Sequence, residues 1–474
     1  MTAAPGTTSG LPLDYAAPQP APAPAPAPVG HSHAPLSMKA NFSWTLAGNV
    51  AYAACQWAML VVLAKLGTPE KVGQFVLGLA VTAPVMLFSS LKLRSVQATD
   101  ARGDFHFGDY FALRLLCTAL ALAVVAVLAL FGGYARETAL VVLAVGTAKA
   151  LESLSDILQG LFQQHERMDW IARSLALKGV LSLAALATVF YLTRSVVFAS
   201  AAMAAAFAAV LALFDLPVSA KLLRANAAHA HASDAHASGA RASLLRPRWH
   251  PATLKALFVL TLPLGVAVAA NSLGANIPRY FLASEGGERV VGIFGAIASP
   301  LAAGVLVINA LGQSAAPRLA KYHAAGAAPA FDRTLRKLLL TGAALGALGL
   351  LFSLVAGRRV LLLLFKPEYA QHFDVFLWLV GAAALQYTYV FLGSAINAMR
   401  FFRIQLPMNL VNPLAGLVAC AVLVPRFGLR GAAWAVFATT VCEGLAYLGI
   451  FFYLRRRRGN GSADAVQAAA PAGR

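Results

Sequence analysis

Long apolar runs separated by short polar connections fill the chain from Asn41 onward. Each run has about 20 residues or more, the length an α-helix needs to cross the hydrocarbon core of a bilayer. The predicted spans are residues 42–64, 72–91, 109–132, 138–163, 170–193, 196–220, 254–283, 290–314, 335–356, 372–397, 404–424 and 430–454. The pattern predicts an all-α polytopic membrane protein with twelve transmembrane helices.

The fourth predicted span carries a polar stripe. Lys149, Glu152, Asp156, Gln159 and Gln163 follow one another at intervals of three or four residues. At about 100° per helical residue they fall within a sector of roughly 80°. A charge inside hydrocarbon costs roughly 2.5–3.5 kcal/mol on insertion scales. We therefore expect the stripe to face protein or a water-filled cavity, where it either serves a transport pathway or locks the bundle through a Lys–carboxylate pair.

Other spans contribute polar residues that are candidates for substrate binding. Lys149 and Lys178 lie far from either end of their spans, where a base can hold an anionic group such as a diphosphate. Arg279 lies near a span end, so it either lines a cavity or extends to the interface. For the amides, hydrogen bonding between helices is the alternative. The predicted substrate-binding residues are Lys149, Lys178, Arg279, Asn49, Gln56 and Asn276.

Four carboxylates lie inside predicted spans, namely Glu152, Asp156, Asp215 and Glu443. An acid inside a membrane protein can exchange protons, so these are candidates for coupling transport to an ion gradient. Pairing with a neighbouring Lys is the alternative role. Arg114 lies close to the end of the third span, and we expect its side chain to extend to the interface.

The overall charge is compatible with this class. Hydrophobic residues make up 59% of the 474 residues and charged residues 12%, against about 25% charged residues in soluble domains. The net charge of +19 reflects Lys and Arg gathered in alternate connections, such as residues 221–255 and 455–458. Such connections stay in the cytoplasm, which predicts that both termini are cytoplasmic. No motif for nucleic-acid binding is present.

Several kinds of chemistry lack their sequence signals. The chain has no phosphate-binding Walker loop, no Gly-x-Ser-x-Gly motif and no Cys/His spacing typical of a metal site. Its four cysteines lie within apolar runs and predict no disulfide framework. His229, His231 and His236 fall in alanine-rich low-complexity sequence rather than in a metal motif. We expect no enzyme, no cofactor and no metal.

Internal repetition suggests two halves. Gly67, Val72, Gly73 and Phe75 recur in the same register as Gly286, Val291, Gly292 and Phe294. An even number of spans per half makes the repeats parallel, which predicts two six-helix lobes around a central cavity. Pro84 and Pro300 are expected to interrupt the second and eighth spans. The predicted parts are a disordered Pro/Ala-rich cytoplasmic tail 1–40, a lobe 41–222, a cytoplasmic linker 223–250, a lobe 251–456 and a cytoplasmic tail 457–474.

Four segments, residues 41–49, 67–75, 93–100 and 159–167, carry a family resemblance. They resemble the bacterial polysaccharide biosynthesis, or O-antigen translocase, proteins of the multidrug/oligosaccharidyl-lipid/polysaccharide exporter superfamily. The resemblance is strongest over the first ~170 residues. It implies two lobes arranged in a V in the inner membrane. It also implies alternating-access flipping of an undecaprenyl-diphosphate-linked oligosaccharide, an O-antigen, capsule or exopolysaccharide repeat unit, from the cytoplasmic to the periplasmic leaflet. Membrane lipids, a polysaccharide polymerase and chain-length machinery are the further partners implied.

Two rival functions remain open. A multidrug or cation antiporter of the same superfamily would use the buried acids to bind cations. A membrane polysaccharide polymerase or ligase is expected to carry its catalytic residues on a large outer loop, and the predicted outer connections here are short.

Overall fold

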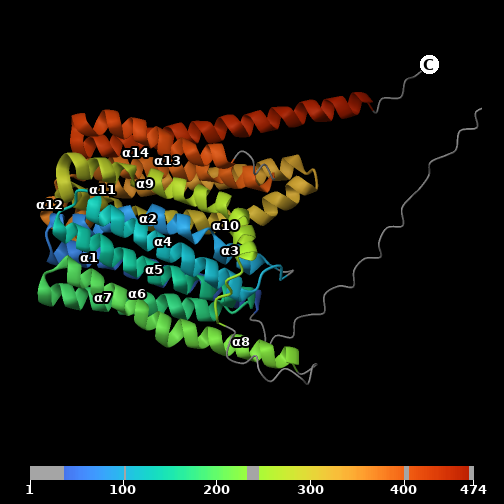
Figure 1. Cartoon of the computed structure of the whole chain (residues 1–474). Helices are drawn as coiled ribbons and strands as arrows, with labels where there is room; N and C mark the ends of the chain where they lie inside the picture. Colours follow the sequence, from blue (N-terminus) through green and yellow to red (C-terminus); the bar gives the residue numbers. More distant parts are fainter. Residues whose placement is uncertain (1–36, 101–102, 232–244, 400–404, 469–474) are drawn as a thin grey trace, which may run out of the picture.

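The computed structural model describes residues 37–100, 103–231, 245–399 and 405–468. Within these ranges the chain is helical with no strand (Figure 1). The helices are α1 Met38–Leu66, α2 Pro69–Ser90, α3 Leu93–Thr99, α4 Phe107–Phe131, α5 Arg136–Gln164, α6 Met168–Thr193, α7 Val196–Val210, the π-helix η1 Leu211–Asp215, α8 Leu216–His231, α9 Pro251–Ala298, α10 Leu301–Ala324, α11 Ala328–Leu364, α12 Pro367–Ala370, α13 Phe373–Ala398 and α14 Gln405–Ala468. Residues 1–36 of the predicted N-terminal tail, residues 232–244 of the predicted linker and residues 469–474 lie outside the described residues.

Ten helices in the described residues are long and apolar enough to cross a membrane. Two of these segments are unusually long, because α9 covers the predicted seventh span and the start of the eighth, and α14 covers the eleventh and twelfth. Each long helix contains one glycine with a left-handed backbone, Gly287 (φ 67°) in α9 and Gly428 (φ 54°) in α14. The all-α membrane class is confirmed, whereas the division into twelve spans and two lobes stays a prediction.

The chain turns back at both glycines. Beyond Gly428, residue 431 approaches Leu423 so closely that a Cβ there would lie 2.1 Å from the Leu423 carbonyl oxygen. A residue with a side chain is strained at these φ angles, so glycine permits the tight turn. The predicted prolines behave differently from each other. The helix ends at Ala298 before Pro300 and restarts at Leu301, as expected, whereas α2 runs through Pro84 unbroken.

The first half of the chain (α1–α8) and the second half (α9–α14) meet mainly where α2 packs along α9. The tightest approach involves two glycines, since a Cβ on Gly73 would lie 1.7 Å from the Glu288 carbonyl oxygen and one on Gly292 1.9 Å from that of Pro69. Both sections of α9 pack on α2, because the Tyr280 hydroxyl also donates to the Ala80 carbonyl at 2.5 Å. Figure 1 shows the two halves on opposite sides of this seam.

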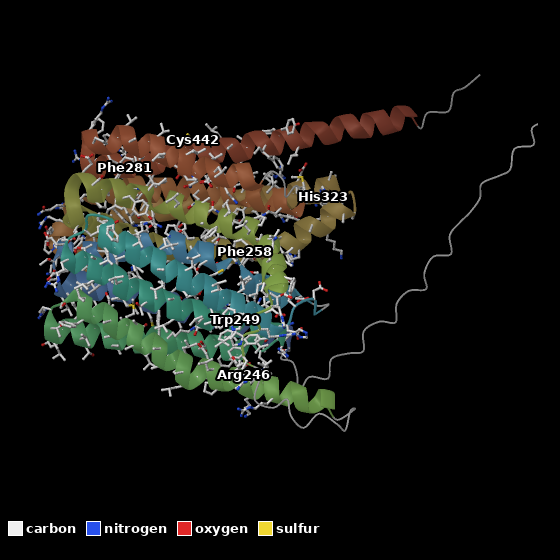
Figure 2. All side chains as sticks on the ribbon, viewed as in Figure 1. Arg246, Trp249, Phe258, Phe281, His323 and Cys442 are labelled. Atoms are coloured by element: carbon white, nitrogen blue, oxygen red, sulfur yellow. The ribbon has the colours of Figure 1, made fainter. Side chains whose placement is uncertain are left out.

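The two ends of the bundle differ. We call the end holding Gly287, Gly428 and α12 the short-loop end, and the end holding α3 and the last turns of α8 the linker end (Figure 1). In Figure 2, Phe281 and Phe258 lie toward these two ends, respectively, of the first section of α9. At the linker end a buried apolar cluster joins Leu91 and Leu93 of the first half to Leu257 of the second.

At the short-loop end, polar side chains connect the two halves. Arg289 of α9 contacts Glu70 of α2 at 2.6 Å and also Glu368 of α12. The Lys366 ammonium donates to the Gly67 carbonyl. Exposed ion pairs of this kind contribute only about 0.2–1 kcal/mol each. The close packing of α2 on α9 therefore does more to hold this end together than its charges do.

Candidate functional site

In the first half of the chain, the polar stripe on α5 reaches α1. The Lys149 ammonium lies 2.7 Å from the Glu152 carboxylate, and both side chains are 27% exposed. The Tyr52 hydroxyl of α1 donates to Glu152 at 2.5 Å, and Gln56 donates to Tyr52 at 2.6 Å. Asn49, one turn away on α1, is exposed and donates to the carbonyl of Thr45 in its own helix. Three of the six predicted substrate-binding residues thus lie along α1 and the facing part of α5.

Asp156 binds two arginines rather than a lysine. Arg94 of α3 lies 3.2 Å from one carboxylate oxygen and Arg114 of α4 lies 3.1 Å from the other. The Arg114 guanidinium also donates to Ser153 at 3.2 Å, and Arg94 donates to Gln159 at 3.0 Å. Arg114 is completely buried, so the expectation that it extends to the interface is wrong. The carboxylate of Asp156 makes burial possible because it neutralises a guanidinium that water no longer reaches.

Two of the segments that carry the family resemblance, residues 93–100 and 159–167, contact each other around α3. The Gln97 side chain packs on the C-terminal part of α5. In the amide orientation that satisfies both of its polar atoms, it donates to the Ile157 carbonyl and accepts from the Leu161 backbone N–H, at 3.1 Å each. Gly160 leaves room for it, because a Cβ there would lie 2.6 Å from the Gln97 side-chain oxygen. Asp100 then accepts from the Tyr110 hydroxyl at 3.0 Å. These contacts fix α3 against α5 and α4 at the linker end.

Lys178 and Asp215 form a buried pair inside the first half. Lys178 of α6 is 1% exposed and Asp215 is fully buried. Their charged atoms are 3.6 Å apart, and Ser155 of α5 donates to the same carboxylate oxygen. Asp215 ends the π-helix Leu211–Asp215, an irregular turn of a kind frequent at functional sites. The alternative considered for Asp215, pairing with a lysine, is what the structure shows, and Lys178 is enclosed within the helices.

The second half contains a polar cavity of about 240 Å³ between α9, α13 and α14. Arg279 of α9 lines it and donates to the Asn276 side chain at 2.7 Å and to the Ala275 carbonyl at 3.1 Å. Within the described residues, no carboxylate lies within 4.0 Å of the Arg279 guanidinium. Arg279 thus differs from Lys149, Lys178, Arg94 and Arg114, each of which has an acidic partner.

Glu443 of α14 lines the same cavity. It accepts hydrogen bonds from the Tyr389 hydroxyl at 2.9 Å and from the Asn412 amide at 3.1 Å. Among the described residues it has no basic partner within 4.0 Å. Gly274 of α9 leaves room for the Asn412 side chain, since a Cβ at Gly274 would lie 2.3 Å from the Asn412 side-chain oxygen. Tyr389 and Asn412 are not among the predicted site residues, because their contact with Glu443 depends on how the helices pack and not on spacing within one span.

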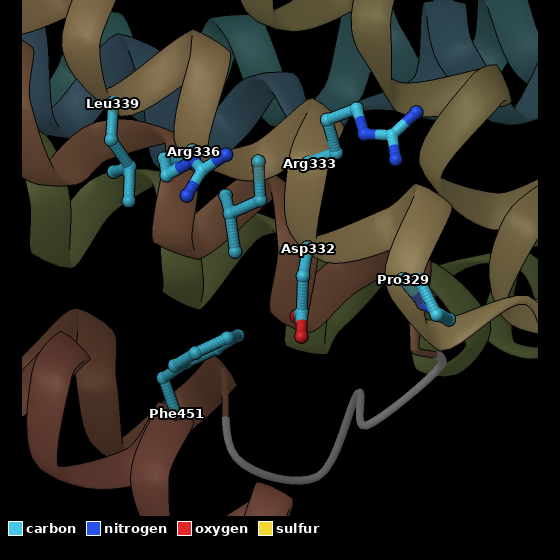
Figure 3. Close-up of a pocket in the computed structure, with 7 residues that line it drawn as sticks. Pro329, Asp332, Arg333, Arg336, Leu339 and Phe451 are labelled. Carbon is cyan, nitrogen blue, oxygen red and sulfur yellow. The ribbon is translucent and has the colours of Figure 1, made fainter.

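A larger hollow of about 450 Å³ lies at the linker end between α11 and α14. Asp332 and Phe451 project into it, and Arg336 lies at its edge (Figure 3). It contains none of the predicted site residues, so it is not the candidate site. In the described ranges no three His, Cys, Asp or Glu side chains gather as a metal site requires.

The arrangement defines a class of protein. A bundle of long apolar helices with paired charges inside one half, and an unpaired base and acid sharing a cavity in the other, is typical of a membrane transporter. Residues 38–323 match the family model for "Polysaccharide biosynthesis protein", more than half of the chain. The chain therefore belongs to the polysaccharide biosynthesis protein family.

Comparison with known proteins agrees with this assignment. The chain is 26% identical over 419 residues to the capsular polysaccharide biosynthesis protein CapF of Staphylococcus aureus, which covers 88% of this chain and all of CapF. The lipid II flippase MurJ has a similar fold, with a TM-score of 0.66, 10% identity and 87% of each chain covered. The MATE transporter VcmN of Vibrio cholerae gives a TM-score of 0.57 at 14% identity, covering 88% of this chain and 97% of VcmN. These structural likenesses establish a transporter-type fold.

Proposed function

We propose that this protein is a flippase for an undecaprenyl-diphosphate-linked oligosaccharide, the repeat unit of a capsule, exopolysaccharide or O-antigen. It moves the sugar from the cytoplasmic to the periplasmic leaflet by alternating access between two six-helix lobes. Membership of the polysaccharide biosynthesis family and the likeness to CapF support the substrate class. In this proposal the protein spans the bacterial inner membrane with both termini in the cytoplasm. A polymerase and chain-length machinery then use the flipped product.

The observation that carries this proposal is the unpaired Arg279 in the polar cavity. A diphosphate needs cationic donors, and a guanidinium binds phosphate oxygens through two parallel hydrogen bonds. Asn276 at 2.7 Å and the Ala275 carbonyl at 3.1 Å both accept from Nη1 and orient the guanidinium, whereas Nε and Nη2 donate to no described residue. Because no carboxylate pairs with Arg279 within the described residues, an anion that enters the cavity can pair with the guanidinium without displacing one.

The predicted residues of the first half take different roles in this proposal. Lys149, Glu152, Asn49 and Gln56 are partly exposed or exposed within a span, so they contact the sugar or the water around it. Charges at this depth avoid hydrocarbon, which favours a cavity over the lipid face. Lys178 acts only indirectly, because it is buried against Asp215.

Ion coupling is assigned to Glu443 ahead of the other three acids. Glu152, Asp156 and Asp215 each have a cationic partner within 4.0 Å, which neutralises their charge. Glu443 has neutral partners, Tyr389 and Asn412, and shares its cavity with Arg279. A proton on Glu443 would change the charge that the diphosphate meets, and this links proton movement to substrate binding.

A second candidate function is a cation or multidrug antiporter, and Glu443 is also the observation that favours it. A carboxylate without a basic partner attracts cations, and the stacked rings of Tyr389 and Tyr447, 5.6 Å apart, lie beside it. Aromatic faces bind organic cations. VcmN and other MATE transporters share the fold. For an antiporter Arg279 would be unfavourable, because its positive charge repels a cationic substrate.

The deciding experiment uses a strain deleted for the gene. The leaflet that holds the undecaprenyl-linked oligosaccharide is measured with a lectin or glycosidase that reaches only the outer leaflet. Accumulation on the inner leaflet, relieved by restoring the gene, is the expected result. Normal outer-leaflet delivery together with altered sensitivity to cationic drugs would refute the flippase and support the antiporter. Chains that lengthen in the presence of labelled precursor would instead indicate a polymerase.

The role of Arg279 is tested by Arg279→Gln. A hydrogen bond to a charged group contributes about 1.5–3 kcal/mol, so we expect export at limiting substrate to fall about 10- to 150-fold. Arg279→Lys should retain part of the activity because the charge remains. The matched control is Arg358→Gln, an exposed arginine at the short-loop end of α11, which should export normally. Equal export by Arg279→Gln and wild type at matched protein level would remove Arg279 from the site.

A further inference from the structure

A second hollow adjoins the polar cavity. It has a volume of about 280 Å³, lies between α10, α11 and α13, and is lined almost entirely by apolar residues and glycines, including Gly304, Gly349, Phe352, Phe376 and Tyr387. We call it the apolar groove. It contains no charged residue, and its hydroxyl groups come from Ser353 and Tyr387. An apolar chain, rather than a sugar or a phosphate, fits this lining.

The apolar groove and the polar cavity are neighbours that share part of their wall. Leu301 and Ala383 line both of them. Tyr387 lies at the junction, where its hydroxyl donates to the Leu301 carbonyl at 3.4 Å. Gly304 makes room for that ring, since a Cβ there would lie 2.0 Å from the Tyr387 hydroxyl oxygen. A charged hollow that contains Arg279 therefore lies next to an apolar one.

The apolar groove reaches the outer surface of the bundle. Val307 of α10 is 50% exposed and Phe352 of α11 is 57% exposed, and both line the groove. Phe376 of α13, which also lines it, is 5% exposed. The groove therefore runs from buried residues beside the polar cavity to side chains that face the bilayer.

We propose that the apolar groove holds the polyprenyl chain of the lipid-linked substrate while its diphosphate lies at Arg279. This inference rests on the proposed function. A flippase must let the sugar cross the protein while the chain stays in an apolar surrounding, because exposing a hydrocarbon chain to water is costly. A lateral groove that shares a wall with the head-group cavity meets this need. A phospholipid would not require the adjoining unpaired arginine.

Gly349 allows the groove to be filled without disturbing the fold. It lines the groove on α11, and a Cβ added there meets nothing within 4 Å. Gly449 of α14 is the matched control, because it also meets nothing within 4 Å, is exposed in a membrane-spanning helix and lies outside the groove. We expect Gly349→Leu to reduce outer-leaflet delivery at least tenfold and Gly449→Leu to leave it unchanged. Equal delivery by the two variants would refute the proposal that the groove binds the substrate.

A crosslinking measurement tests the occupant directly. The purified full chain in nanodiscs of phosphatidylethanolamine and phosphatidylglycerol is irradiated with a polyprenyl diphosphate that carries a diazirine on its chain. Adducts on α10, α11 and α13 that unlabelled undecaprenyl diphosphate removes, and that Gly349→Leu loses, are expected. Equal labelling by a diazirine-bearing phosphatidylglycerol would overturn the proposal, since the groove would then be an ordinary lipid-facing surface.

The two proposals fail in different ways. If the deleted strain delivers its oligosaccharide normally, the flippase function is wrong and the groove has no polyprenyl occupant. If delivery requires the gene, yet competed adducts appear only on helices other than α10, α11 and α13, the flippase stands and the groove alone is wrong.

Discussion

Replacing Lys178 by methionine should destabilise the protein strongly, because it leaves Asp215 as a buried charge without a counter-charge. The two charged groups are 3.6 Å apart and both are almost fully enclosed. At an effective dielectric constant of about 20, Coulomb's law gives an attraction of roughly 5 kcal/mol. Breaking a buried pair costs about 3–5 kcal/mol in measured cases. One Asp215 oxygen would keep only the hydroxyl of Ser155, and the other has no hydrogen-bond partner among the described residues.

A double-mutant cycle measures the interaction energy between Lys178 and Asp215. Lys178→Met and Asp215→Asn each leave one buried charge, so each should lose about 3–5 kcal/mol. The double variant removes both charges and should recover at least half of that loss. Unfolding is followed by denaturation with SDS in mixed micelles, and outer-leaflet delivery is measured in parallel at matched expression.

Two results would refute this reasoning. If Lys178→Met unfolds within about 0.5 kcal/mol of wild type, the pair adds nothing to stability. If the double variant loses as much as the two single variants added together, the two charges are not coupled. Single variants that keep full stability but abolish delivery would give the pair a direct part in transport.

Three further predictions test other parts of the structure. Gly292→Ala should destabilise the contact of α2 with α9, because its Cβ would lie 1.9 Å from the Pro69 carbonyl oxygen. Gly349→Ala should leave stability unchanged, because its Cβ meets nothing within 4 Å. Thermal melting in detergent compares the two variants. Arg289→Gln should cost less than about 2 kcal/mol, because it breaks two pairs of at most about 1 kcal/mol each, one exposed and one half-buried, and the loss should shrink at high salt; a larger, salt-independent loss would contradict this. Glu443→Gln should make export insensitive to a protonophore, and continued sensitivity would exclude Glu443 as the coupling acid.

The helices could be predicted from the sequence, whereas the geometry of their connections could not. Apolar length alone identified the membrane-spanning segments, since a helix that crosses a bilayer satisfies its own backbone groups whatever its neighbours are. The position of Pro300 likewise marked the end of α9, because proline lacks the donor that continues a helix. The turns at Gly287 and Gly428 lie in the predicted connections 284–289 and 425–429, but apolar periodicity does not encode the backbone angles that make them so tight.

Local spacing also predicted part of the candidate site. Lys149 and Glu152 pair at i, i+3 in one helix, and helical geometry makes such neighbours meet. Gln159 and Gln163 share the stripe with Asp156, and all three contact Arg94 of α3. The sequence placed these residues on one face, but it did not identify the arginine that the face binds.

Within this protein, the sequence by itself determined the helical membrane class, the family segments and the pairs that lie within one helix. These depend on hydrophobic length and on neighbours three or four positions apart. Only the tertiary structure decided which charges are neutralised. Asp156 meets Arg94 and Arg114 across 62 and 42 residues of chain, and Lys178 meets Asp215 on another helix. Arg279 has no such acid among the described residues, and this difference, which arises from how helices pack, is the reason we propose it as a binding group.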